Sequence, residues 1–85
     1  MQRAELAEVV LAKVAQVLGV TVDEIDESTD LRGEYDVDSL ELMEIGTRLE
    51  NALGIRIGAD ALLEMRDIGH AVDLLHERAA DREHA

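Results

Sequence analysis

Aliphatic residues recur at three- and four-residue steps in three stretches of the chain, and this is the spacing of one face of an α-helix. The first stretch covers residues 4–18 and the second residues 39–53. Each is followed by a glycine, Gly19 or Gly54, which can end a helix in the left-handed conformation. The third begins after Asp67, whose side chain can cap the first turn. No proline interrupts these stretches, so the sequence predicts an all-α fold.

The apolar positions of each stretch predict the face that packs inward. They are Leu6, Val9, Val10, Val14, Val17 and Leu18 in the first, Leu42, Ile45, Leu49 and Leu53 in the second, and Ile68, Ala71, Val72 and Leu75 in the third. A fourth, short helix is expected over residues 61–65, capped by Asp60. A chain of 85 residues has room for one small domain. We therefore expect a single domain over residues 1–85, with an ordered core at about 4–77 and a frayed charged tail at 78–85.

A long connection without sustained periodicity, residues 20–38, separates the first two helices. Loops of this length inside a compact domain tend to be functional or locally structured. Residues 22–25 are expected to form one short helical turn. Five apolar side chains are expected to anchor the crossing in the core, namely Val22, Ile25, Leu31, Tyr35 and Val37.

The charge balance narrows the choice of partners. Twenty acidic residues against eight basic ones give a formal net charge of −12, which repels nucleic acids and anionic membranes. A partner with a basic patch is the complementary expectation. The chain has no cysteine, so any thiol chemistry would require an added cofactor. No membrane span or secretory signal is evident, and we expect a cytoplasmic monomer.

Ser39 stands where the long connection meets the second helix, a position that favours an exposed hydroxyl. On its own such a serine is usually no more than a helix cap, and Asp38 or Ser39 can fill that role. A hydrolase serine is disfavoured because the Gly-x-Ser-x-Gly turn is missing. The spacing of His70 and His76 does not suit a shared metal, so these residues and His84 are expected at the surface. We expect no metal site and no catalytic residue.

Three segments of the sequence resemble acyl carrier proteins, and the resemblance runs from about Leu6 to Leu75. The segments are Asp38-Ser39-Leu40 before an amphipathic helix, Leu49-Glu50 with Leu53-Gly54-Ile55-Arg56-Ile57, and Asp67-Ile68-Gly69-His70-Ala71-Val72. The resemblance implies an acyl-carrier-like four-helix bundle of three main helices and one short helix. It also implies that Ser39 carries 4′-phosphopantetheine, derived from coenzyme A, whose thiol holds acyl groups as thioesters. Asp38 would help to position the transferase or its metal, and the chain would be a carrier, not an enzyme.

The resemblance further implies that the helix beginning at Ser39 is the element that partners recognise. The docking residues expected on its outer face are Leu40, Glu41, Met43, Glu44 and Thr47, and Glu50 is a further acidic candidate. The implied partners are a phosphopantetheinyl transferase and an acyltransferase, ketosynthase or other synthase enzymes with basic docking patches. Carboxylates on this face would steer encounter more than they add affinity.

Two residues of this helix depart from the expected pattern. Gly46 lies mid-helix, where glycine costs about 1 kcal/mol relative to alanine, and we interpret it as a point of close approach for another helix or a partner. Arg48 interrupts the acidic face. The segment Asp38-Ser39-Leu40-Glu41-Leu42-Met43-Glu44, together with Arg48-Leu49-Glu50, resembles carriers of type II polyketide systems more than housekeeping fatty-acid carriers. Fatty-acid and peptidyl or aminoacyl carriers are the alternatives. An unmodified acidic helical adaptor is the alternative from a different class of protein. The sequence does not identify the acyl or aminoacyl cargo.

Overall fold

Helices form all the regular structure in residues 2–83, the part of the chain that the computed structural model describes, and no strand occurs there. The elements are α1 (Arg3–Leu18), the 3₁₀ turn η1 (Val22–Glu24), α2 (Leu31–Tyr35), α3 (Ser39–Leu53), α4 (Ala59–Glu64) and α5 (Ile68–Glu83). The predicted all-α fold is confirmed. The connection between α1 and α3 adds two short elements to it.

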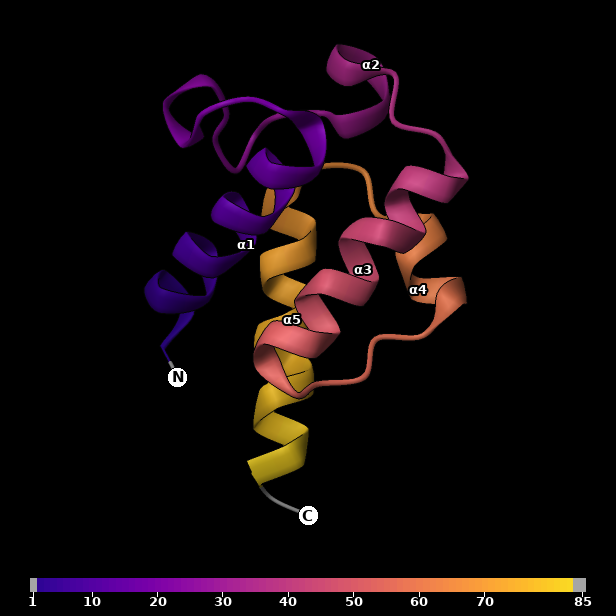
Figure 1. The fold of residues 1–85 in the computed structure, drawn as a ribbon. Coiled ribbons are helices and arrows are strands. Elements are labelled where there is room, and N and C mark those ends of the chain that lie inside the picture. The colour runs from indigo at the N-terminus through magenta and orange to yellow at the C-terminus, as the bar shows by residue number, and fades with distance from the viewer. Residues whose placement is uncertain (1, 84–85) are drawn as a thin grey trace.

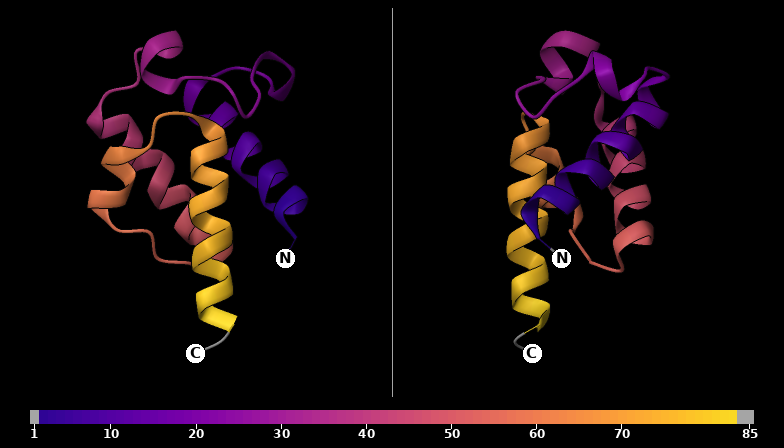
Figure 2. Two further views of the ribbon diagram at one scale, coloured as in Figure 1. Left: turned by 180° about the vertical axis from the view of Figure 1, so that it is seen from behind. Right: turned by 90° about the vertical axis from the view of Figure 1, so that its left-hand side faces the viewer.

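The three long helices pack around one aliphatic core, with α4 beside α3 and α2 across one end of the bundle (Figure 1). Helix α1 contacts both α3 and α5, and the views from behind and from the side show α5 running the length of the bundle (Figure 2). The fully buried side chains include Leu6, Val10 and Val14 of α1, Leu42, Ile45 and Leu49 of α3, and Ile68, Val72 and Leu75 of α5. The helical spacing in the sequence thus identified the inward faces.

The predicted helix ends follow the glycine and aspartate signals. Gly19 and Gly54 close α1 and α3 in the left-handed conformation, with φ angles of 73° and 66°. The Asp67 carboxylate accepts a hydrogen bond of 2.8 Å from the His70 amide at the start of α5. The glycine helix ends and the aspartate cap satisfy backbone groups that the helices themselves leave unpaired.

The long connection is anchored as expected at most of its apolar positions. Ile25, Leu31 and Val37 are buried and Tyr35 is half-buried, but the prediction for Val22 is wrong, because its side chain is 49% exposed. Val22 opens η1 on the outer side of the turn, whereas Ile25 leaves that turn in an extended conformation and reaches the core.

Backbone hydrogen bonds fasten the connection to the segment between α4 and α5. The Leu31 amide donates to the Arg66 carbonyl at 3.3 Å, and the Ile68 amide donates to the Thr29 carbonyl at 3.3 Å. Arg3 of α1 adds an ion pair of 2.6 Å with Glu27. Residues far apart in the sequence therefore hold the connection, and local periodicity carries no signal for such bonds.

Helix α4 differs from its prediction at both ends. It begins at Ala59 with Gly58 as the preceding cap residue and ends at Glu64, so Asp60 lies in the first turn and is not the cap. The φ angle of Gly58 is 92°, a backbone conformation that residues other than glycine rarely adopt. The extended connection before it, not a polar side chain, therefore sets where α4 starts.

Helix α5 runs to Glu83, beyond residue 77, where we expected the ordered core to end. Ala79 and Ala80 favour continuation of the helix past that point. Fraying of residues 78–85 stays a prediction, and residues 84–85, which include His84, lie outside the described residues.

Candidate functional site

Ser39 is the first residue of α3, and Asp38 is the cap that starts this helix. The Asp38 carboxylate accepts a 2.8 Å hydrogen bond from the Glu41 amide, which decides between the two cap candidates. Ser39 is exposed, and its hydroxyl has no hydrogen-bond partner among the described side chains, those of residues 2–80, or the described backbone. The cap fixes the direction of the Ser39 backbone without occupying its hydroxyl.

The chain has one other serine, Ser28, and its hydroxyl is engaged. It donates to the Asp26 carboxylate at 2.6 Å, and the Ser28 amide donates to the same oxygen at 2.8 Å. These bonds, the hydroxyl's first, lower the pKa of the Asp26 carboxyl below its ordinary value. Ser28 is thus part of a turn, whereas the Ser39 hydroxyl is available for reaction.

The start of α3 is suited to hold a phosphate ester on Ser39. Within the described residues, the amides of Ser39 and Leu40 have no hydrogen-bond acceptor, because Asp38 caps only the Glu41 amide. Free amides and the positive end of the helix dipole favour an anion at this position. A phosphodiester at the Ser39 oxygen therefore fits the residues that surround it.

Two apolar side chains stand on the outer face of α3 beside Ser39. Leu40 is 80% exposed and Met43 is 37% exposed. Thr47 lies farther along and is also exposed, and its hydroxyl donates to the Met43 carbonyl at 2.9 Å. The structure thus places these three predicted docking residues at the surface.

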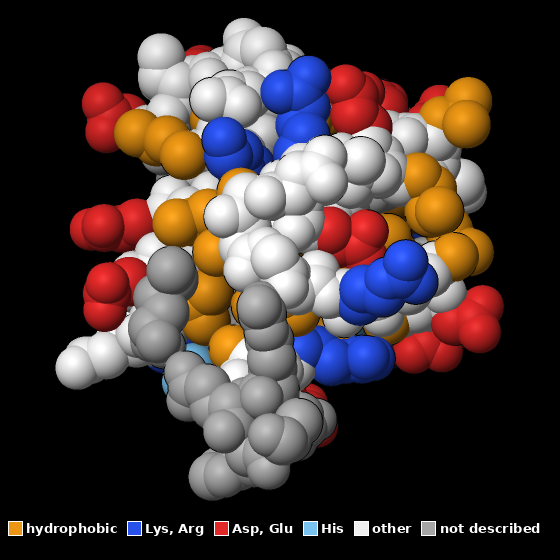
Figure 3. Space-filling view, turned by 60° about the horizontal axis from the view of Figure 1, so that its bottom comes forward, with side chains coloured by type: hydrophobic (Ala, Val, Ile, Leu, Met, Phe, Trp, Pro, Cys, Tyr) orange, Lys and Arg blue, Asp and Glu red, His pale blue; other side chains and the backbone are white. Residues whose placement is uncertain are grey.

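Helix α4 adds Leu63 to the apolar surface, with 42% of the side chain exposed. Apolar side chains gather along the right-hand edge of the molecule in Figure 3, where Figure 1 places α4 and the start of α3, with acidic side chains beside them. The sequence analysis did not identify Leu63. The sequence offers one hint: Leu62 and Leu63 are consecutive, and two consecutive residues of a short helix cannot both face the core. Leu62 is the buried one.

The acidic side chains of α3 differ in their burial and in the groups that they contact. Glu41 is half-buried and Glu44 is exposed, and Glu44 forms an ion pair of 3.2 Å with Arg48 one turn later. The Glu50 carboxylate accepts from the Ile57 amide at 2.7 Å and from the Gly58 amide at 3.4 Å. Glu50 therefore holds the connection between α3 and α4 and has a structural role.

Gly46 is buried on the side of α3 that faces α4. A Cβ atom at this position would overlap the Leu62 side chain, falling 2.5 Å from its Cδ2 and 3.0 Å from its Cγ. Of the two interpretations of this glycine, close approach of another helix is the one the structure supports.

The histidines of α5 lie at the surface. His70 and His76 are exposed, as predicted. Within residues 2–80, whose side chains the structure describes, no group of three or more His, Cys, Asp or Glu side chains is arranged to hold a metal ion. The described helices also include none with the length and apolar character needed to cross a membrane.

Comparison with known proteins adds a family and several relatives. A family model described as "Phosphopantetheine attachment site" matches residues 8–75. An "Acyl carrier protein" of Saccharopolyspora erythraea is 34% identical over 74 residues, covering 87% of this chain and 78% of the relative. An "Acyl carrier protein" of Petrotoga mobilis is 31% identical over 92% of each chain. "Polyketide-8 synthase acyl carrier protein 2" of Streptomyces avermitilis is 34% identical, covering 80% of this chain and 78% of that one.

Proposed function

The chain belongs to the acyl carrier protein family, and from this premise we propose that Ser39 is the residue that bears its 4′-phosphopantetheine. Proteins of this family are carriers and not catalysts, and they work with synthase enzymes and a phosphopantetheinyl transferase. The matched family model gives the cofactor but not the residue that bears it.

One observation supports the choice of Ser39 above the others. Of the two serines, Ser39 has the exposed hydroxyl without a partner in residues 2–83, and it opens a long helix, whereas Ser28 is bonded to Asp26. A transferase needs both access to the hydroxyl oxygen and a defined direction of approach. The start of α3 offers both.

The residues around Ser39 would act on the arm in simple ways. Modification joins the Ser39 oxygen to the phosphoryl group of the arm while the pyrophosphate bond of coenzyme A breaks, so that adenosine 3′,5′-bisphosphate leaves and the transferase accepts the hydroxyl proton. The free amides at the start of α3 would stabilise the resulting negative charge. When bound, the arm supplies a terminal thiol that holds acyl groups as thioesters, and the flexible arm raises their effective concentration at a docked partner.

Intact-mass analysis after incubation with coenzyme A and a broad-specificity phosphopantetheinyl transferase tests this proposal. We expect the wild-type chain to gain one phosphopantetheine, Ser39→Ala to gain none, and the matched control Ser28→Ala to gain one. Modification of Ser39→Ala, or its loss in Ser28→Ala alone, would contradict the assignment. No gain in the wild-type chain with any transferase would instead favour the unmodified adaptor.

We also propose that partners dock on the outer face of α3. Leu40 and Met43 would enter an apolar depression of the partner, and Glu41, Glu44 and Thr47 would lie at its basic or polar rim. The ion pair between Glu44 and Arg48 reduces the net negative charge at that point, so Glu41 is the more available carboxylate for a basic patch. Asp38, next to Ser39, would contribute to positioning the transferase.

For the pathway, we propose polyketide or related secondary-metabolite synthesis. The support is the similarity to a carrier whose name places it in a polyketide synthase and the segment around Arg48. A fatty-acid carrier and a peptidyl or aminoacyl carrier are the alternatives. Transfer of malonyl groups to the modified chain by an acyltransferase, with no aminoacylation by adenylating enzymes, would exclude the peptidyl alternative. We further propose that the chain acts as a monomeric, cytoplasmic carrier domain.

A further inference from the structure

Asp36 has a backbone conformation that is uncommon for a residue with a side chain. Its φ angle is 52°, and within residues 2–83 no other residue except glycine has a positive φ. Asp36 ends α2, and its amide donates to the Leu31 carbonyl. Aspartate tolerates this left-handed conformation better than most residues, but glycine adopts it more readily. The end of α2 therefore does not itself require a carboxylate at this position.

The short junction between α2 and α3 places Asp36 close to the start of α3. Val37 is buried, and its amide donates to the Leu31 carbonyl at 3.2 Å. Asp38 caps α3, and Ser39 follows it directly. Three residue steps span at most about 11 Å even when fully extended. The backbone of Asp36 therefore lies within that distance of the backbone of Ser39, and Val37 anchors the segment between them.

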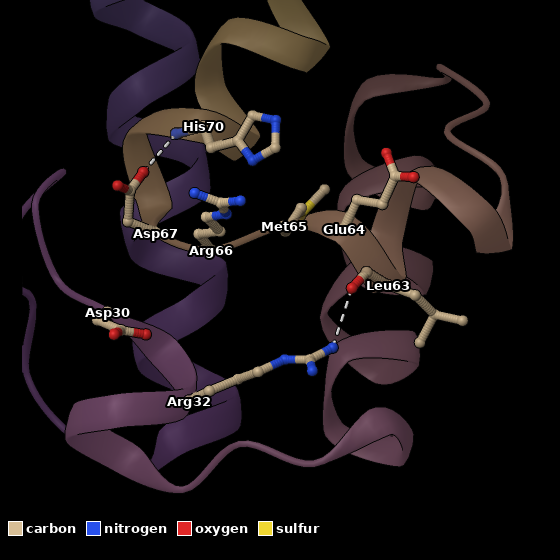
Figure 4. A pocket seen from close by; sticks show the side chains of 8 residues that line it. All are labelled: Asp30, Arg32, Leu63, Glu64, Met65, Arg66, Asp67 and His70. Carbon is tan, nitrogen blue, oxygen red and sulfur yellow. Dashed lines mark hydrogen bonds between the residues drawn. The ribbon is translucent and has the colours of Figure 1, made fainter.

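Helix α2 is also held by groups outside the junction. The Leu31 amide at its start donates to the Arg66 carbonyl at 3.3 Å. The Arg32 guanidinium donates to the Leu63 carbonyl at the end of α4 at 3.0 Å (Figure 4). These bonds tie α2 to the segment that joins α4 to α5. Asp36, at the other end of this short helix, therefore has a defined position relative to the start of α3.

The Asp36 carboxylate is exposed, and it has no hydrogen-bond or ion-pair partner among the described side chains, those of residues 2–80, or the described backbone. Other carboxylates near the junction are engaged. Asp38 caps α3, and Glu34 accepts from a backbone amide at 2.6 Å. Glu44 is paired with Arg48. Asp36 thus offers an unpaired negative charge on a well-held backbone.

We propose that Asp36 is a specificity-determining residue for attachment of the arm, and that its carboxylate pairs with a lysine or arginine side chain of the phosphopantetheinyl transferase. The proposal rests on the attachment of the arm to Ser39. A carboxylate on a backbone that is already fixed loses little freedom when it pairs, so more of the attraction is available for binding. A charge pair beside the reacting hydroxyl also fixes the orientation in which the enzyme docks.

Asp36 would extend the recognised surface to the α2 side of Ser39. The docking residues proposed above, such as Glu41, follow Ser39 on α3, and Figure 1 shows α2 and α3 leading away from the junction in different directions. Charge pairs on both sides of Ser39 would restrict rotation of the enzyme about this residue, which contacts on α3 alone leave freer. A basic side chain is favoured over a metal ion as the occupant, because no group of three or more potential ligands occurs among the side chains of residues 2–80.

Steady-state kinetics of arm transfer from coenzyme A by a broad-specificity transferase test the proposal. Asp36→Asn removes the charge but keeps a side chain that tolerates the left-handed conformation, and Asp36→Gly removes the charge and eases that conformation. We expect both variants to lower kcat/KM about two- to fivefold at low salt, the range for one exposed charge pair, mainly by raising KM. High salt should reduce the difference from the wild type. The control Glu77→Gln removes an equal charge from an exposed position of α5 and should stay near the wild-type value.

Asp36→Ala separates the charge from the conformation, because alanine lacks the carboxylate and disfavours a positive φ. Slow transfer in Asp36→Ala alone, with wild-type kinetics for the asparagine and glycine variants, would overturn the proposal and limit Asp36 to ending α2. An equal fall for Glu77→Gln would overturn it by assigning the effect to net charge. A fall in kcat with an unchanged KM would also contradict it. Thermal unfolding checks that each variant is folded. Failure of Ser39 itself would be visible beforehand, because the intact mass of the wild-type chain would show no arm.

Discussion

The two serines of the chain show how strongly surroundings decide the use of one residue type. Ser28 has its hydroxyl and its amide committed to Asp26, whereas Ser39 has a hydroxyl with no partner in residues 2–83. Sequence position pointed to Ser39 through the helix that follows it. The bonded state of Ser28 depends on a turn that the sequence pattern did not reveal.

Ser28→Ala should raise the pKa of Asp26 toward its ordinary value, because the hydroxyl bond is the largest cause of its lowered pKa. A carboxyl whose pKa is lower in the folded state stabilises the fold above its unfolded pKa, about 3.9, and loses that effect as pH falls through the folded pKa. The stability advantage of the wild type should therefore be present at pH 7 and vanish in acid. Carbon-13 titration of the Asp26 carboxyl and urea unfolding at both pH values measure it. An unchanged pKa would contradict the role given to the hydroxyl.

Gly46→Ala should destabilise the fold although alanine is the better helix former. Overpacking against Leu62 costs about 1–3 kcal/mol, which exceeds the propensity gain of about 1 kcal/mol over most of that range. Urea unfolding measures the difference, with Asn51→Ala, an exposed position of α3, as the control. Combination with Leu62→Ala should reduce the cost of the added methyl group. Equal or greater stability of the single variant would show that α4 moves aside without cost.

At the scale of elements, α3 combines a buried apolar face with a capped start and an exposed outer side. Asp38 belongs to both the cap and the surface next to Ser39. Its structural role and the recognition role proposed for it can be separated, because asparagine caps about as well as aspartate but lacks the charge.

Asp38→Ala should lower the free energy of unfolding by about 1 kcal/mol through loss of the cap, whereas Asp38→Asn should retain most of it. Both variants should be modified more slowly by the transferase if the charge of Asp38 positions that enzyme. Thermal unfolding and the initial rate of phosphopantetheine transfer measure the two effects. A wild-type transfer rate in Asp38→Asn would limit Asp38 to its role as a cap.

At the scale of the whole molecule, acidic residues outnumber basic ones, and the two signs are interspersed at the surface. The hollow between α2, α4 and the start of α5 is an example, because Arg32 and Arg66 line it together with Asp30, Glu64 and Asp67 (Figure 4). Acidic side chains on α3 lie beside the apolar side chains of Leu40 and Met43. The surface charge is therefore not uniform. An uneven pattern of charge can fix the orientation of a partner as well as speed its encounter with the chain.

Reversing the charge of Glu41 and Glu44 to lysine should slow transfer of the arm more than the same reversal at Glu8 and Glu77. The latter pair is exposed on α1 and α5 and changes the net charge equally. For the wild type, the rate should fall as salt rises, because screening shortens the range of attraction. Stopped-flow or discontinuous mass assays at low and high salt measure both effects, with circular dichroism to confirm folding. Equal rates for the two double variants would count against docking on α3.

The sequence by itself determined the helical class, the inward faces of the three long helices and the glycine ends. Each of these follows from spacing or from neighbours within a turn. The tertiary structure decided what distant segments do to one another. It showed that Glu50 holds the α3–α4 connection, that Gly46 admits Leu62, and that Arg32 and Arg66 line one hollow. Helix periodicity is a local property, whereas partners separated by many residues are chosen only when the core packs.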